Sequence, residues 1–233
     1  MINIKDNIAA IEQQILQACQ KNDRKFNEVC LLAVSKTKPN ALIEQAYQAG
    51  QRHFGENYCQ EALEKINQLK HLNDIYWHFI GPIQSNKTKL ISENFTWVHS
   101  VERLKIIDRL NTQRGEYCAV YSDKPPLNIC LQVNISQEPS KSGIMPEQVD
   151  EFAKRVTQSA HLTLRGLMAI PQKNAPTSTY LYMQDLYNQL KTQYSSVDTL
   201  SLGMSNDLDT AIAAGSTMVR IGTAIFGARD YQI

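Results

Sequence analysis

The chain has 233 residues, of which 42% are hydrophobic, and 24 lysines and arginines nearly balance 23 aspartates and glutamates. This balance, without a block of like charges, argues against a sequence-independent nucleic-acid surface and favours a small-molecule ligand. No apolar run is long enough to cross a bilayer, and the first residues lack the pattern of a signal peptide. We therefore expect a cytoplasmic protein without nucleic-acid or membrane contacts.

The five cysteines are odd in number and lack the spacing of metal ligands. This pattern favours reduced thiols over a disulfide framework and predicts no metal site. The length allows either one α/β barrel or two smaller domains.

The chain is predicted to open with an amphipathic helix, because Ile4, Ile8, Ile11, Ile15 and Cys19 recur at helical spacing. Eight candidate strands follow, most with a helical pattern after them. They cover residues 29–35, 53–55, 76–80, 95–98, 128–134, 163–168, 199–202 and 217–221. Further helices are predicted from Pro39 to Gly50, after Pro146, and after Ser205 as its N-cap.

Near-continuous apolar strands joined by helices indicate a parallel sheet that is buried on both faces. Eight such units predict an α/β fold, a single (β/α)8 barrel of the TIM type with an extra N-terminal helix. An open doubly wound sheet is the alternative. Without a visible linker or repeat, we expect one domain over residues 1–233.

Lys36 ends the first apolar strand, at the edge where barrels of this kind carry function. It could supply the amine for a Schiff base to pyridoxal phosphate. If the extended conformation persists to Lys38, the two ammonium groups point the same way, and their repulsion favours the neutral amine. A pair of solvated lysines is the alternative, and the stronger one for an isolated Lys-x-Lys.

Arg220, Gly222 and Thr223 close the last predicted strand. Glycine permits close backbone approach to a phosphate, and threonine adds donors. Arg220 could contact a pyridine nitrogen and leave it unprotonated, which would make the ring a weak electron sink. The alternative for Arg220 is an ion pair at the rim with a nearby aspartate.

Other candidates are individually ambiguous. Ser205, after Met204, could donate to an anion or only cap a helix, and the nearby Asp207 would oppose a phosphate. Asn57 could contact the ring or cap a helix. Met168 could pack in the core or on a cofactor face. His78 is predicted to be a core histidine.

Seven segments taken together resemble the pyridoxal-phosphate homeostasis proteins, single-domain relatives of the alanine racemase N-terminal barrel. They are residues 33–39, 54–58, 77–87, 141–143, 165–170, 201–205 and 220–227. The resemblance implies pyridoxal 5'-phosphate bound as an internal aldimine on Lys36. It also implies a phosphate site of Ser205, Gly222 and Thr223, with Arg220 at the ring nitrogen and Asn57 near the ring; Met168 and Met204 complete the expected set.

The function that the resemblance implies is binding, buffering and delivery of the cofactor, with effects on amino-acid and keto-acid balance and without catalytic turnover. Apo forms of enzymes that use the cofactor would be recipients, and we expect a monomer. A weakly active amino-acid racemase is the enzymatic alternative, although the chain stops at Ile233, before the second domain of alanine racemases. A regulatory module is a third possibility, and a role of Lys38 or Lys141 in transfer stays open.

Overall fold

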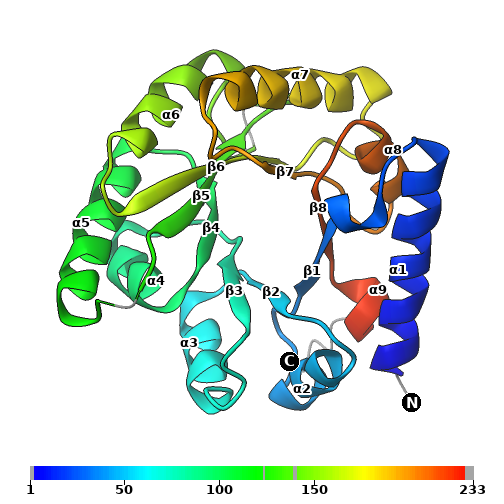
Figure 1. The fold of residues 1–233 in the computed structure, drawn as a ribbon, viewed down its shortest axis with the longest axis horizontal. Coiled ribbons are helices and arrows are strands. Elements are labelled where there is room, and N and C mark those ends of the chain that lie inside the picture. The colour runs from blue at the N-terminus through cyan, green and yellow to red at the C-terminus, as the bar shows by residue number, and fades with distance from the viewer. Residues whose placement is uncertain (1–2, 123, 139–140, 229–233) are drawn as a thin grey trace.

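The computed structural model describes residues 3–122, 124–138 and 141–228. Eight parallel strands pair in chain order, and the last pairs with the first to close a barrel (Figure 1). The strands are β1 (Cys30–Val34), β2 (His53–Glu56), β3 (Tyr76–Phe79), β4 (Trp97–Val101), β5 (Leu127–Val133), β6 (Leu162–Ala169), β7 (Thr199–Ser201) and β8 (Met218–Ile221). The predicted barrel is confirmed, and the open sheet is wrong.

Helices surround the strands (Figure 1). They are α1 (Ile4–Lys21), α2 (Asn40–Gln48), α3 (Cys59–Gln68), α4 (Thr88–Asn94), α5 (Leu104–Val120), α6 (Val149–Thr157), α7 (Thr177–Gln193), α8 (Leu208–Ala213) and α9 (Thr223–Phe226). Short 3-10 turns cover Phe26–Glu28, Ser85–Lys87 and Pro146–Gln148. In the described part of the chain, no helix has the length and apolar character needed to span a membrane.

The predicted N-terminal helix is α1, which lies beside α8 and α9 (Figure 1). Its isoleucines are buried, and the side chain of Asn3 caps it by accepting the N–H of Asp6 at 3.2 Å. The side chain of Asn7 donates to the carbonyl of Ile225 in α9 at 2.8 Å. The extra helix is therefore fastened to the segment that follows β8.

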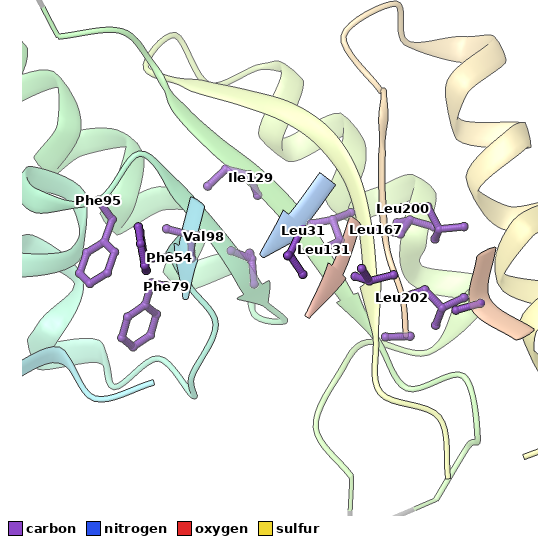
Figure 2. Close-up of a cluster of buried hydrophobic side chains, with 14 of the residues drawn as sticks. Leu31, Phe54, Phe79, Phe95, Val98, Ile129, Leu131, Leu167, Leu200 and Leu202 are labelled. Carbon is purple, nitrogen blue, oxygen red and sulfur yellow. The ribbon is translucent and has the colours of Figure 1, made fainter. Parts of the chain in front are cut away.

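An apolar layer lies between strands and helices (Figure 2). Phe79 and Phe95 meet edge to face, with ring centroids 5.3 Å apart, and Phe54 is fully buried beside Trp77. Successive side chains of a strand point to opposite faces. Because Trp77 and Phe79 pack in this layer, His78 between them points into the barrel.

Inside the barrel, three histidines form a hydrogen-bonded chain. His53 Nδ1 lies 3.0 Å from His78 Nε2, and His78 Nδ1 lies 2.9 Å from His99 Nε2. His78 also stacks on Trp97, with a centroid distance of 5.3 Å. The prediction that His78 is a core histidine is confirmed, because it is fully buried with both ring nitrogens in hydrogen bonds.

Burial keeps the histidines of this hydrogen-bonded series neutral. It lowers the pKa of His99 to about 3, with the charge of Arg220 acting in the same direction, and it lowers the pKa of His78 well below its usual value. Since the unfolded chain then binds the proton more tightly than the folded one, stability is complete above about pH 6.5 and falls as the pH drops toward the folded pKa.

We expect His99 alone to cost about 2 kcal/mol of stability between about pH 7.5 and about pH 5. Urea unfolding at both pH values measures the free energy of unfolding. Its decrease between the two pH values should be about 2 kcal/mol smaller in His99→Gln than in the wild type. Replacement of His71, whose side chain is 61% exposed, is the matched control and should leave the loss unchanged. An equal loss in wild type and His99→Gln would contradict the assignment.

Candidate functional site

A cavity of about 550 Å³ opens at the carboxyl ends of the strands. Segments that follow β1, β2, β3, β6, β7 and β8 contribute its walls. The eight residues predicted to bind a cofactor all line it: Lys36, Asn57, Met168, Met204, Ser205, Arg220, Gly222 and Thr223. Other lining residues are Val34, Lys38, Ile80, Ile170, Asn206, Ala224 and Gly227.

Lys36 lies in a tight turn. β1 ends at Val34, Thr37 has a φ of +59°, and the N–H of Lys38 donates to the carbonyl of Ser35 at 3.1 Å. The expectation of an extended segment from Lys36 to Lys38 is therefore wrong. Both side chains still line the cavity, and Lys38 Nζ donates to the carbonyl of Ala228 at 2.5 Å.

Arg220 reaches the cavity floor from β8. Its guanidinium donates to the carbonyl and hydroxyl oxygens of Ser201, at 2.7 and 2.9 Å, and to the carbonyl of Ala169 at 2.9 Å. Burial lowers its pKa to about 10, so it stays charged at neutral pH. These bonds orient the guanidinium, and the alternative of a rim ion pair is wrong for this buried side chain.

Gly222 and Thr223 form the entrance to α9, with Gly222 in the N-cap position. A Cβ atom on Gly222 would lie 3.2 Å from the carbonyl oxygen of Val34, tighter than ordinary contact. The first N–H groups of a helix have no acceptor within it. This corner of the cavity therefore presents backbone donors beside the Thr223 hydroxyl.

Ser205 does not cap a helix, contrary to the prediction. α8 begins at Leu208 with Asp207 as its N-cap. The carboxylate of Asp207 accepts the N–H of Met204 at 2.6 Å and the hydroxyl of Tyr180 at 2.8 Å. These bonds hold Met204 and Ser205 in a turn before the helix. They also give hydrogen-bond donors to the Asp207 carboxylate, whose charge was expected to oppose an anion.

Asn57 does not cap a helix either, since Tyr58 is the N-cap residue of α3. Its side-chain Oδ1 is buried without a hydrogen-bond partner among the described residues. A Cβ atom on Gly81 would lie 2.1 Å from the carbonyl oxygen of Asn57, so only glycine fits there. Close packing against the segment after β3 thus fixes the position of Asn57 at the cavity wall.

Met168 is only 1% exposed and packs with Trp97 and Cys130 inside the barrel, beneath the cavity. Both of its predicted roles remain compatible with this position. Lys141 is not among the described residues that line the cavity; its Nζ lies 3.4 Å from Glu138 Oε1. The five cysteines are free thiols in the structure.

Sequence reasoning missed the groups that hold the predicted residues. Ser201 orients Arg220, Tyr180 holds Asp207 and with it the turn of Ser205, and a buried lysine, Lys65, donates to the carbonyl of Ser35 next to Lys36. Their partners are distant in the chain, so no local motif joins them. No group of three or more potential metal ligands occurs among the described residues.

Comparison with known proteins places this chain in a family. Residues 7–230 match the family model described as "Alanine racemase, N-terminal domain". A protein from Escherichia coli strain K12 named "Pyridoxal phosphate homeostasis protein" is 51% identical over 241 residues, which cover 100% of this chain and 99% of the relative.

Solved structures with a similar fold support this placement. PipY of Synechococcus elongatus PCC7942, determined with PLP bound, is 33% identical with a TM-score of 0.82, covering 96% of this chain and 100% of PipY. Alanine racemase from Corynebacterium glutamicum, 13% identical with a TM-score of 0.68, shares the fold over 98% of this chain and 62% of its own. The chain therefore belongs to the alanine racemase N-terminal domain family, alongside full-length relatives named pyridoxal phosphate homeostasis protein.

Proposed function

We propose that this protein binds pyridoxal 5'-phosphate at the carboxyl end of its barrel, holds it covalently on Lys36, and buffers and delivers it to apo enzymes without catalysing a reaction of its own. The observation that carries the proposal is the convergence of Lys36, Arg220 and the Gly222-Thr223 corner on one cavity. PLP in the related PipY structure supports it.

The residues at the cavity suit the chemical groups of this cofactor. The backbone at Gly222 and the hydroxyls of Ser205 and Thr223 offer donors to a phosphate. Arg220 is a permanent donor for the ring nitrogen. The buried Oδ1 of Asn57 has no described partner and suits a donor from the ligand, such as the ring hydroxyl.

Lys36 would load the cofactor by condensation. Its neutral amine adds to the aldehyde carbon, a C=N bond forms, and the aldehyde oxygen leaves as water, so no oxidant or reductant is needed. A bound pyridoxal ring supplies an electron sink for carbanions when its nitrogen is protonated. Arg220 keeps that nitrogen unprotonated by donating to it, which restrains such chemistry.

The residues that line the cavity also favour the function of a cofactor carrier over that of a racemase. Racemisation needs proton-transfer groups on both faces of the substrate α-carbon. Of the described residues that line the cavity, only Lys36, Lys38 and Arg220 have ionisable side chains. The ammonium of Lys38 is engaged with the carbonyl of Ala228, and Arg220 does not release its proton near neutral pH.

We predict that the cofactor-loaded protein exchanges the α-protons of amino acids into deuterated water no faster than Lys36→Ala incubated with the same cofactor. NMR across a panel of amino acids measures the exchange, and the visible absorbance of the wild type verifies loading. Rapid exchange that depends on Lys36 would make the protein an enzyme and contradict the carrier proposal.

A second prediction concerns the turn that carries Ser205. Tyr180→Phe removes the hydroxyl donor to Asp207. We expect the dissociation constant of the cofactor to rise roughly fivefold, equivalent to about 1 kcal/mol for one net hydrogen bond. Absorbance titration measures it. Tyr187→Phe, another buried tyrosine of α7, is the control and should bind normally; equal affinities in all three proteins would refute a role for this turn.

A further inference from the structure

A buried lysine lies directly behind the turn that carries Lys36. Lys65, in α3, is only 5% exposed. Its Nζ donates to the carbonyl of Ser35 at 2.7 Å, to Glu56 Oε1 at 2.8 Å and to Glu61 Oε1 at 2.5 Å. An ammonium group has three N–H donors, so this environment satisfies Lys65 completely.

The same groups hold the backbone on both sides of Lys36. On one side, the hydroxyl of Ser35 donates to Glu56 Oε1 at 2.6 Å. On the other, the N–H of Thr37 donates to Glu61 Oε1 at 2.6 Å. Lys65 contacts both carboxylates and thereby connects the hydrogen bond at Ser35 with the one at Thr37.

The backbone conformation of Thr37 shows why the hydrogen bonds on both sides of Lys36 are needed. Its φ of +59° lies in the left-handed region, which is unfavourable for a β-branched residue. Such a conformation persists only where surrounding contacts impose it. The N–H of Thr37 donates to the carboxylate of Glu61, which also accepts a hydrogen bond from Lys65.

Burial makes the cluster sensitive to the loss of Lys65. Glu56 is fully buried, and burial raises its pKa while the ammonium of Lys65 opposes the rise. Glu56 Oε2 has no hydrogen-bond partner among the described residues. Without Lys65, two carboxylates would share one site, and the carbonyl of Ser35 would lose one of its two donors and keep only the N–H of Lys38.

We propose that Lys65 is a positioning residue, which uses Glu56 and Glu61 to set the Ser35–Thr37 turn and so directs the amine of Lys36 toward the aldehyde of the cofactor. The inference rests on the proposed function, because it takes Lys36 as the lysine that binds the cofactor. Lys65 acts through the backbone and is absent from the described cavity lining. Its effect therefore falls on covalent loading and not on recognition of the phosphate.

Lys65→Met tests this, with two ligands as probes. Pyridoxal phosphate reports covalent loading through its absorbance and through trapping with borohydride. Pyridoxine 5'-phosphate carries an alcohol instead of the aldehyde, so it reports recognition alone. We expect loading to slow about tenfold to a hundredfold, the effect of misplacing a reacting group by a fraction of an ångström to an ångström, while affinity for pyridoxine 5'-phosphate stays within about twofold.

Arg114→Met is the matched control. Arg114 is also a buried cation, 2% exposed, and it donates to the carbonyls of Ser92 and Pro125, the latter just before β5 at the other end of the barrel. We expect it to lower stability toward denaturant without slowing loading. Slow loading in Arg114→Met as well would mean that general destabilisation explains the effect, and the proposal would fall.

Glu61→Leu keeps the test decisive if Lys65→Met does not fold, because the side chain of Glu61 is 28% exposed and the substitution frees the N–H of Thr37. Wild-type loading in a folded Lys65→Met or Glu61→Leu protein would overturn the proposal. Equal losses of loading and of pyridoxine 5'-phosphate affinity would also overturn it. Failure of the proposed function looks different: the wild type itself would trap no cofactor, or Lys36→Ala would trap as much.

Discussion

Closure of the barrel between its first and last strands is the constraint on which the site depends. In the parallel register of β1 and β8, Leu32 lies opposite Arg220 and Ala33 opposite Ile221. The turn after β1 and the turn after β8 are therefore neighbours, although Lys36 and Gly222 are far apart in the chain. α1 supports this seam from outside through Asn7 and α9, so the extra helix stabilises the part of the barrel that carries the site.

Polar side chains are buried in the interior of the barrel. Branched apolar residues usually fill the interior of TIM barrels, whereas this interior also holds three histidines and Arg220. The arginine donates to Ser201 and Ala169, and both ring nitrogens of His78 are hydrogen-bonded to the other two histidines, whereas His99 Nδ1 has no partner among the described residues. Such groups are costly unless they are paired, and pairing fixes their geometry. The cavity consequently has a rigid floor with one oriented positive charge.

The fold was largely predictable because its determinants are local. Apolar runs located all eight strands, with differences mainly at their ends; β4, for example, continues to Val101. Errors arose where a distant side chain changes local geometry. Glu61 accepts the N–H of Thr37 in a segment expected to be extended, and Tyr180 donates to Asp207, which replaces Ser205 as the N-cap, so the helix begins at Leu208. Lys65 gave no signal, because its acceptor Ser35 is 30 residues away.

The most direct test of the account is to identify the lysine that carries the cofactor. Borohydride reduction of the loaded protein makes the C=N bond permanent, and peptide mass spectrometry then locates the modification. We expect one principal site at Lys36, with Lys38 and Lys141 essentially unmodified, since Lys36 lines the cavity together with Arg220, whereas Lys38 Nζ donates to the carbonyl of Ala228 and Lys141 lies outside the described lining. Principal modification of Lys38 or Lys141, or none on any lysine, would contradict it.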